Sequence, residues 1–201
     1  MQNKRRKKNF VGALDIELIE DSVRACANNA LQLTNEAGKL LEQEAYSRSM
    51  FLALTAIEEM GKVIMLLSSI WHSQADAAFW RRFWKRFRTH GEKFGRMQML
   101  IAVGPELFSE FQGFARLLGK HARVVQLLRG NRELALYVDF NEEGDLVEPS
   151  RFTPQQAQEV VEAAQDLAGH FRIWSLFPKG TLSQLKDMGK PTDTEGPSTS
   201  R

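Results

Sequence analysis

The chain has 201 residues, of which 43% are hydrophobic and 26% charged, and its net charge is +2. A chain of this length buries about 70% of the surface that it exposes when unfolded, so one domain with one core is expected. The hydrophobic and charged fractions exclude disorder throughout the chain. The small net charge does not by itself require a polyanionic partner. Cys26 is the single cysteine, and its small and apolar helical neighbours predict a reduced, buried thiol rather than a nucleophile.

Both ends of the chain differ in composition from its middle. Residues 1–10 form a basic arm, and the apolar stretch that follows is too short for the hydrophobic core of a signal peptide. Residues 179–201 are rich in Gly, Pro, Ser and Thr and predict a disordered tail. We therefore expect one helical domain over residues 11–178.

Residues 14–45 carry apolar side chains at helical spacing and predict a long amphipathic helix. Residues 50–71 differ, because their apolar side chains leave almost no solvent face. Three ionisable residues near the centre of this stretch would cost roughly 2.5 to 3.5 kcal/mol each in a bilayer. The stretch therefore predicts a buried helix at the centre of a bundle, and a cytoplasmic protein without membrane contact.

Aromatic side chains recur at i, i+4 and i+8 over residues 79–87, while arginines and lysines occupy the other faces. His90 continues the aromatic stripe, so we expect its side chain to point inward and the arginines outward. Basic and aromatic residues together could bind nucleic acid, but such aromatics at helical spacing more often belong to a core.

The second half of the chain continues the helical pattern. Gly104 and Pro105 break the chain before a further helix that ends near Gly130, and residues 132–140 fit either a helix end or an extended segment. Residues 141–152 read as a loop, and Thr153 begins a capping box for a last helix to about residue 177. The sequence thus predicts an all-α bundle with a short irregular segment near 137–152.

On the apolar helix, the polar groups share one narrow stripe, since Lys62 lies about 40° and Glu59 about 100° from Glu58 around the axis. One interpretation is a solvated edge with Glu58 and Lys62 as an ordinary i, i+4 pair. The other is a polar pocket, internal or between subunits, in which these groups meet His90.

Several chemistries lack their motifs. Di-metal carboxylate bundles need Glu-x-x-His, and none of the four histidines has a glutamate three residues before it. One cysteine and scattered histidines do not support zinc. The chain also lacks a Walker A motif, a Gly-rich dinucleotide loop and Gly-x-Ser-x-Gly. No metal and no cofactor are expected.

Four segments, taken in order, resemble the AbiV-type abortive infection family of the HEPN superfamily. They are the helix from residue 25 to 41, the run Ala56-Ile57-Glu58-Glu59-Met60-Gly61-Lys62, the run from Phe83 to His90 with Lys93, and the segment from Arg132 to Leu136-Tyr137-Val138-Asp139. The resemblance spans residues 11–174 and implies a HEPN-like helical bundle.

The resemblance also implies an anti-phage effector that acts on RNA or the translation machinery to arrest infected bacteria. It implies a homodimer, a phage-encoded trigger and metal-independent RNase chemistry, in which a histidine transfers the proton and basic residues contact the scissile phosphate. The residues expected to be catalytic are His90, Lys62, Glu59, Lys93 and Glu58, and those expected to bind substrate are Arg132, Tyr137, Arg86 and Asp139.

Related RNases use Arg-x4-6-His, and this chain departs from that pattern at His90. The positions that would need arginine hold Phe83, Trp84 and Lys85, and Arg86 lies one residue too close. Arg116 and His121 have four residues between them, yet that spacing places them about 140° apart on a regular helix. The alternative function is therefore a non-enzymatic interaction protein whose polar cluster is structural.

Overall fold

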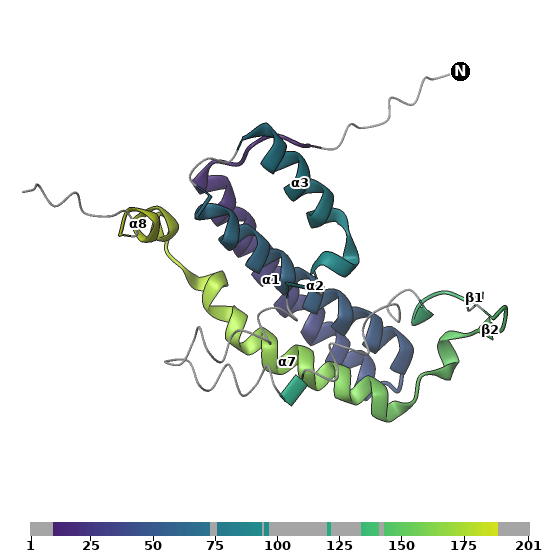
Figure 1. Cartoon of the computed structure of the whole chain (residues 1–201). Helices are drawn as coiled ribbons and strands as arrows, with labels where there is room; N and C mark the ends of the chain where they lie inside the picture. Colours follow the sequence, from purple (N-terminus) through teal and green to yellow (C-terminus); the bar gives the residue numbers. More distant parts are fainter. Residues whose placement is uncertain are drawn as a thin grey trace, which may run out of the picture.

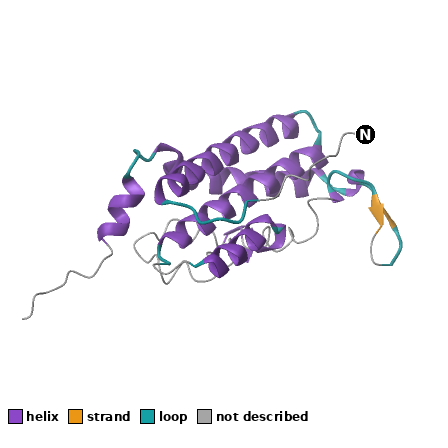
Figure 2. Ribbon diagram, turned by 90° about the horizontal axis from the view of Figure 1, so that it is seen from above, coloured by secondary structure: helices purple, strands orange, loops and turns teal. Residues whose placement is uncertain are grey.

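A computed structural model describes residues 10–72, 76–93, 95–96, 120–121, 134–140 and 143–188. Three long helices form its centre: α1, Ile16–Glu42; α2, Tyr46–Ile70; and α7, Pro154–Leu176. Each of the three packs against the other two. Figure 1 shows α1 and α2 side by side with α7 running along them, and Figure 2 shows the same bundle from above. The predicted helical bundle is confirmed.

The first two helices are the ones that the sequence predicts, and both follow from their side chains. Asp15 caps α1 by accepting the backbone N–H of Leu18 at 2.7 Å, and small buried residues such as Ala27, Ala30 and Ala37 let α2 and α7 approach it closely. In α2 most side chains are buried, including Leu54, Ile57 and Met60. Burial of α2 at the centre of the bundle is therefore confirmed.

The helix α3, Ala77–Arg88, begins at its N-cap Asp76, whose side chain accepts the Phe79 N–H at 2.7 Å. Trp80 and Phe83 are buried, whereas the basic residues of α3 are exposed, as predicted. The segment before α1 contacts α3 at Trp84. The indole Nε1 of Trp84 donates to the Gly12 carbonyl at 2.8 Å, and its ring meets that of Phe10 edge to face.

An antiparallel hairpin of β1, Asp139–Phe140, and β2, Leu146–Val147, projects from the bundle. A 3₁₀ turn η2, Pro149–Arg151, leads to Thr153, which forms the predicted capping box with Gln156 at the start of α7. These elements make up the irregular segment expected near 137–152. The helix expected between residues 105 and 130 lies outside the described residues, except for helical residues 120–121.

The expected disordered tail begins too early, because α8, Thr181–Met188, lies inside it. Leu182 is 2% exposed, and the buried carboxylate of Glu20 in α1 accepts the backbone N–H groups of Gly180, at 2.9 and 3.0 Å, and of Leu182, at 3.3 Å. Gly180 has a φ of 89°, a conformation that favours glycine. Composition missed this helix because its anchor is a distant carboxylate. Residues 189–201 lie outside the described part.

None of the helices that the structure describes combines the length and the apolar character needed to cross a membrane.

Candidate functional site

A close backbone approach at Gly61 positions the candidate site. A Cβ atom added at Gly61 would lie 2.5 Å from the carbonyl oxygen of Lys93, so helical residues 90–93 pack directly on α2 at a place where only glycine fits. Gly61 belongs to the run Glu58-Glu59-Met60-Gly61-Lys62, and its role there is to admit the second segment. The contact brings His90 and Lys93 to the polar residues of α2.

Glu58 is the centre of this contact and is 2% exposed. Its Oε2 lies 2.6 Å from Nδ1 of His90 and 3.1 Å from Nζ of Lys93. An ionised carboxylate only accepts hydrogen bonds, so Nδ1 of His90 carries the proton in this contact. Lys93 is only 4% exposed, and its ammonium balances the buried charge of Glu58.

Glu59 and Lys62 form a second pair beside the first. Lys62 Nζ donates to Glu59 Oε1 at 2.5 Å and lies 5.7 Å from the centre of the Phe87 ring. Of the two interpretations of this stripe, the ordinary i, i+4 pair of Glu58 and Lys62 is wrong, because Glu58 contacts His90 and Lys93 instead. The name Glu58 cluster is used below for Glu58, Glu59, Lys62, His90 and Lys93.

Cys26 of α1 borders the Glu58 cluster, a neighbour that the sequence did not indicate. Burial, and next the Glu59 carboxylate, raise the pKa of its thiol from 9.0 to about 12. The side chain is partly rather than fully buried, but this environment supports the expectation of an unreactive thiol.

We expect Cys26 to react slowly with Ellman's reagent at pH 8, because the thiolate is the nucleophile and a pKa near 12 leaves very little of it. Unfolding in denaturant should restore the reactivity of a free thiol. The unfolded chain would lose this proton near pH 9 and the folded chain only near pH 12, so this group also lowers stability as pH rises between those values. Equal reaction rates for folded and unfolded protein would contradict this expectation.

His90 does not point inward as expected, since 49% of its side chain is exposed. The reason is that α3 ends at Arg88 and its C-cap Thr89 is extended, so the aromatic stripe does not continue through residue 90. The result is an imidazole that is open to solvent on one side and held by a buried carboxylate on the other. The aromatic residues Trp80 and Phe83 are buried, which removes them as platforms for stacking bases.

The structure separates the predicted substrate-binding residues from one another. Arg86 lies near the Glu58 cluster on α3, with its Nε 3.9 Å from Glu92. Tyr137 and Asp139 are exposed at the hairpin and share no hydrogen bond or ion pair with the Glu58 cluster in the described part of the chain. Arg132 lies outside the described residues, as does Arg116.

A second polar cluster joins residues 120–121 to α7. His121 is 4% exposed and its Nε2 lies 2.8 Å from Oδ2 of Asp166, which also accepts from Lys120 at 3.1 Å. The hydrogen bond to His121 is the main reason that the pKa of Asp166 is lowered. The Arg-x4-His spacing marked His121 in the sequence, but no signal marked Asp166.

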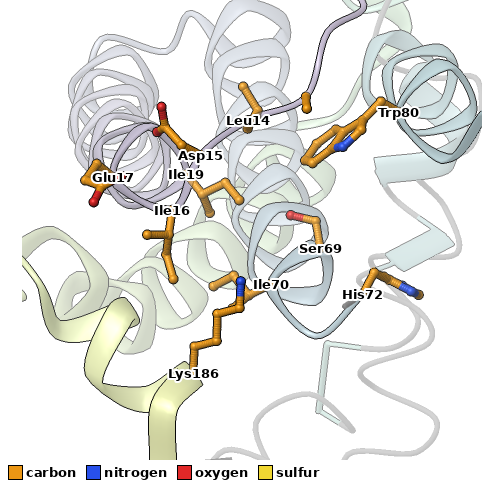
Figure 3. A pocket seen from close by; sticks show the side chains of 11 residues that line it. Leu14, Asp15, Ile16, Glu17, Ile19, Ser69, Ile70, His72, Trp80 and Lys186 are labelled. Atoms are coloured by element: carbon orange, nitrogen blue, oxygen red, sulfur yellow. The ribbon is translucent and has the colours of Figure 1, made fainter. Parts of the chain in front are cut away.

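A cavity of about 340 Å³ lies at the end of the bundle where α1, α2, α3 and α8 meet. Figure 3 shows Trp80 and Ser69 on its wall, while Lys186 extends from α8 toward the end of α2. None of the predicted site residues that the structure describes lines it. Within the described ranges, no three His, Cys, Asp or Glu side chains gather as metal ligands would.

A comparison with known families matches residues 18–169 to the HEPN_AbiV family model, described as AbiV. The match covers well over half of the chain. This chain belongs to the AbiV family. It is an abortive-infection protein of the HEPN type, as the resemblance implied. The match includes α2, α3, the Glu58 cluster and most of α7. No curated protein and no solved structure matches the chain.

Proposed function

We propose that this AbiV-family protein arrests the growth of phage-infected bacteria by acting on RNA or the translation machinery, with the Glu58 cluster as a metal-independent RNase centre. The observation that carries the proposal is the exposed imidazole of His90, whose Nδ1 lies 2.6 Å from the buried carboxylate of Glu58. A carboxylate that orients a histidine and fixes its tautomer is a recurrent arrangement for proton transfer.

In the proposed reaction Nε2 of His90 removes the proton from an RNA 2′-hydroxyl. The 2′ oxygen then bonds to phosphorus and the bond from phosphorus to the 5′ oxygen breaks, with the leaving oxygen taking a proton from water. The products are a 2′,3′-cyclic phosphate and a 5′-hydroxyl. General-base assistance of this kind contributes about 10²- to 10⁴-fold to a rate.

The other residues of the Glu58 cluster have supporting roles in this proposal. The side chain of Lys62 is 22% exposed, so its ammonium can approach the charge that develops on the phosphate, and Glu59 orients it. Lys93 is too buried to meet RNA and instead pairs directly with the Glu58 carboxylate. Arg86 would contact a neighbouring phosphate. In this proposal the protein is a cytoplasmic homodimer, and a phage-encoded trigger activates it.

The test replaces His90 with alanine. We expect His90→Ala to abolish growth arrest on expression and to slow RNA cleavage by the purified protein about 100-fold or more. Because the side chain of His90 is half exposed, its removal should not prevent folding. Thermal unfolding of His90→Ala should therefore show a cooperative transition, as in the parent protein. His170→Ala, which removes an exposed histidine of α7, is the control and should retain both activities.

The rival is a non-enzymatic interaction protein in which the same contacts are structural. It would replace our proposal if the purified protein cuts no RNA and His90→Ala still arrests cells at equal abundance. If expression causes neither toxicity nor phage resistance, the defence role itself fails. Loss of cleavage in His121→Ala with retention in His90→Ala would move the reactive centre to the His121 and Asp166 pair.

A further inference from the structure

A second cavity, of about 230 Å³, lies between α2 and α3 and is separate from the Glu58 cluster. The residues that line it include Arg82, Arg86 and Arg96, together with His72 and Ser68. Among the described residues that line it, none is acidic. We propose that this cavity, called the arginine pocket below, binds a phosphate group.

The charge on α3 supports an anionic ligand. Arg82 and Arg86 stand at i and i+4 on one face of α3, where two like charges repel each other. In the described part of the chain Arg82 has no hydrogen bond or ion pair, and the nearest carboxylate of Arg86 is that of Glu92 at 3.9 Å. The ion pair between Arg86 and Glu92 is long and joins exposed side chains, so it offsets little of this positive charge, which a phosphate would balance.

The walls of the arginine pocket are held in place by packing. Phe83 is buried and lines the pocket, and Phe79 stacks on it with ring centroids 6.3 Å apart. The ring of His72 lies 4.6 Å from that of Phe79, which fixes the end of α2 against α3. Guanidinium groups on such a supported helix lose less freedom on binding than those on a loop.

The size of the arginine pocket limits what it can hold. Pockets for drug-sized ligands usually measure roughly 300–1,000 Å³, so a cavity of about 230 Å³ suits a phosphate with part of its ester rather than a whole cofactor. The phosphate can come from an RNA strand or from a free nucleotide. Arginine forks bind both through the same paired hydrogen bonds. The inference extends the phosphate contact that the proposed function gives to Arg86, but binding here requires neither His90 nor cleavage.

The test measures binding of three probes to the full chain: inorganic phosphate, adenosine 5′-monophosphate and a short fluorescent single-stranded RNA. The pocket variant Arg82→Gln/Arg86→Gln should weaken binding about tenfold or more. The control Arg81→Gln/Lys85→Gln removes the same charge from exposed positions of α3 that do not line the pocket, and it should change affinity about twofold or less. All four positions are exposed, so the fold should survive in both variants.

Each outcome decides the proposal. Selective loss in the pocket variant supports it, with RNA as the source of the phosphate if only RNA binds and a free nucleotide if only the monophosphate binds. Equal weakening by the pocket and control variants would show a diffuse electrostatic effect and overturn it. Failure of all three probes to bind the parent would overturn it as well. A catalytically inactive His90→Ala protein should bind the probes like the parent, which separates this result from that of the cleavage test.

Discussion

Gly61→Ala should displace residues 90–93 from α2 and abolish the Glu58 cluster. Alanine favours a helix over glycine by about 1 kcal/mol, so α2 alone would gain from the change. The new Cβ atom, however, would lie 2.5 Å from the backbone oxygen of Lys93, and a backbone atom cannot rotate away as a side chain can. Overpacking of this kind costs about 1–3 kcal/mol, and we expect a net loss of stability.

Denaturant unfolding measures the stability of Gly61→Ala, and the growth and cleavage assays measure its function. Gly169→Ala is the matched control, because Gly169 lies exposed in α7 with no atom within 4 Å of an added Cβ. The control should be as stable as the parent or slightly more stable. A Gly61→Ala protein with raised stability and full activity would show that residues 90–93 do not need their contact with α2.

Glu58→Gln should destabilise the fold more than any single surface change. The substitution keeps the shape of the side chain but removes the charge that compensates Lys93, which is 4% exposed. Removing one partner of a buried ion pair costs about 3–5 kcal/mol, because the other charge stays buried without compensation. Chemical unfolding should therefore shift to lower denaturant concentration without a change in cooperativity.

A double-mutant cycle separates the ion pair from other effects of Glu58→Gln. Lys93→Met removes the orphaned charge with an apolar chain of similar length, so the double variant should recover much of the lost stability. Glu36→Gln, at an exposed position of α1, should stay within about 0.5 kcal/mol of the parent. If the stability losses of Glu58→Gln and Lys93→Met simply add in the double variant, the contact of Glu58 and Lys93 at 3.1 Å carries no coupling energy. That result would contradict a mutually compensating ion pair.

Residue periodicity was enough to predict the helices that bury a face. The apolar side chains of α2, the aromatic stripe of α3 and the Thr153 capping box are local patterns, and each produced the expected element. The predicted start of the disordered tail was wrong because α8 depends on a distant contact and not on a local pattern. Only Leu182 of α8 is deeply buried, and its anchoring carboxylate, Glu20, lies 162 residues earlier in the chain.

The candidate site shows the same division between local and distant information. The helical angles placed Glu58, Glu59 and Lys62 on one stripe of α2, and the resemblance added His90 and Lys93, which contact Glu58 in the structure. The angles could not show that α3 ends at Arg88, so the orientation of His90 was wrong. The angles also could not show that Lys62 pairs with Glu59 and Lys93 with Glu58, because this pairing depends on how closely two backbones approach at Gly61.

The contact between Glu20 and the start of α8 has a consequence for how the chain folds. It holds α8 to α1 through a few hydrogen bonds and one deeply buried side chain, whereas the three long helices share a continuous hydrophobic core. Docking of α8 should therefore be among the last steps of folding and among the first to reverse. Opening there would leave the rest of the bundle intact, with a carboxylate uncovered at one end of α1.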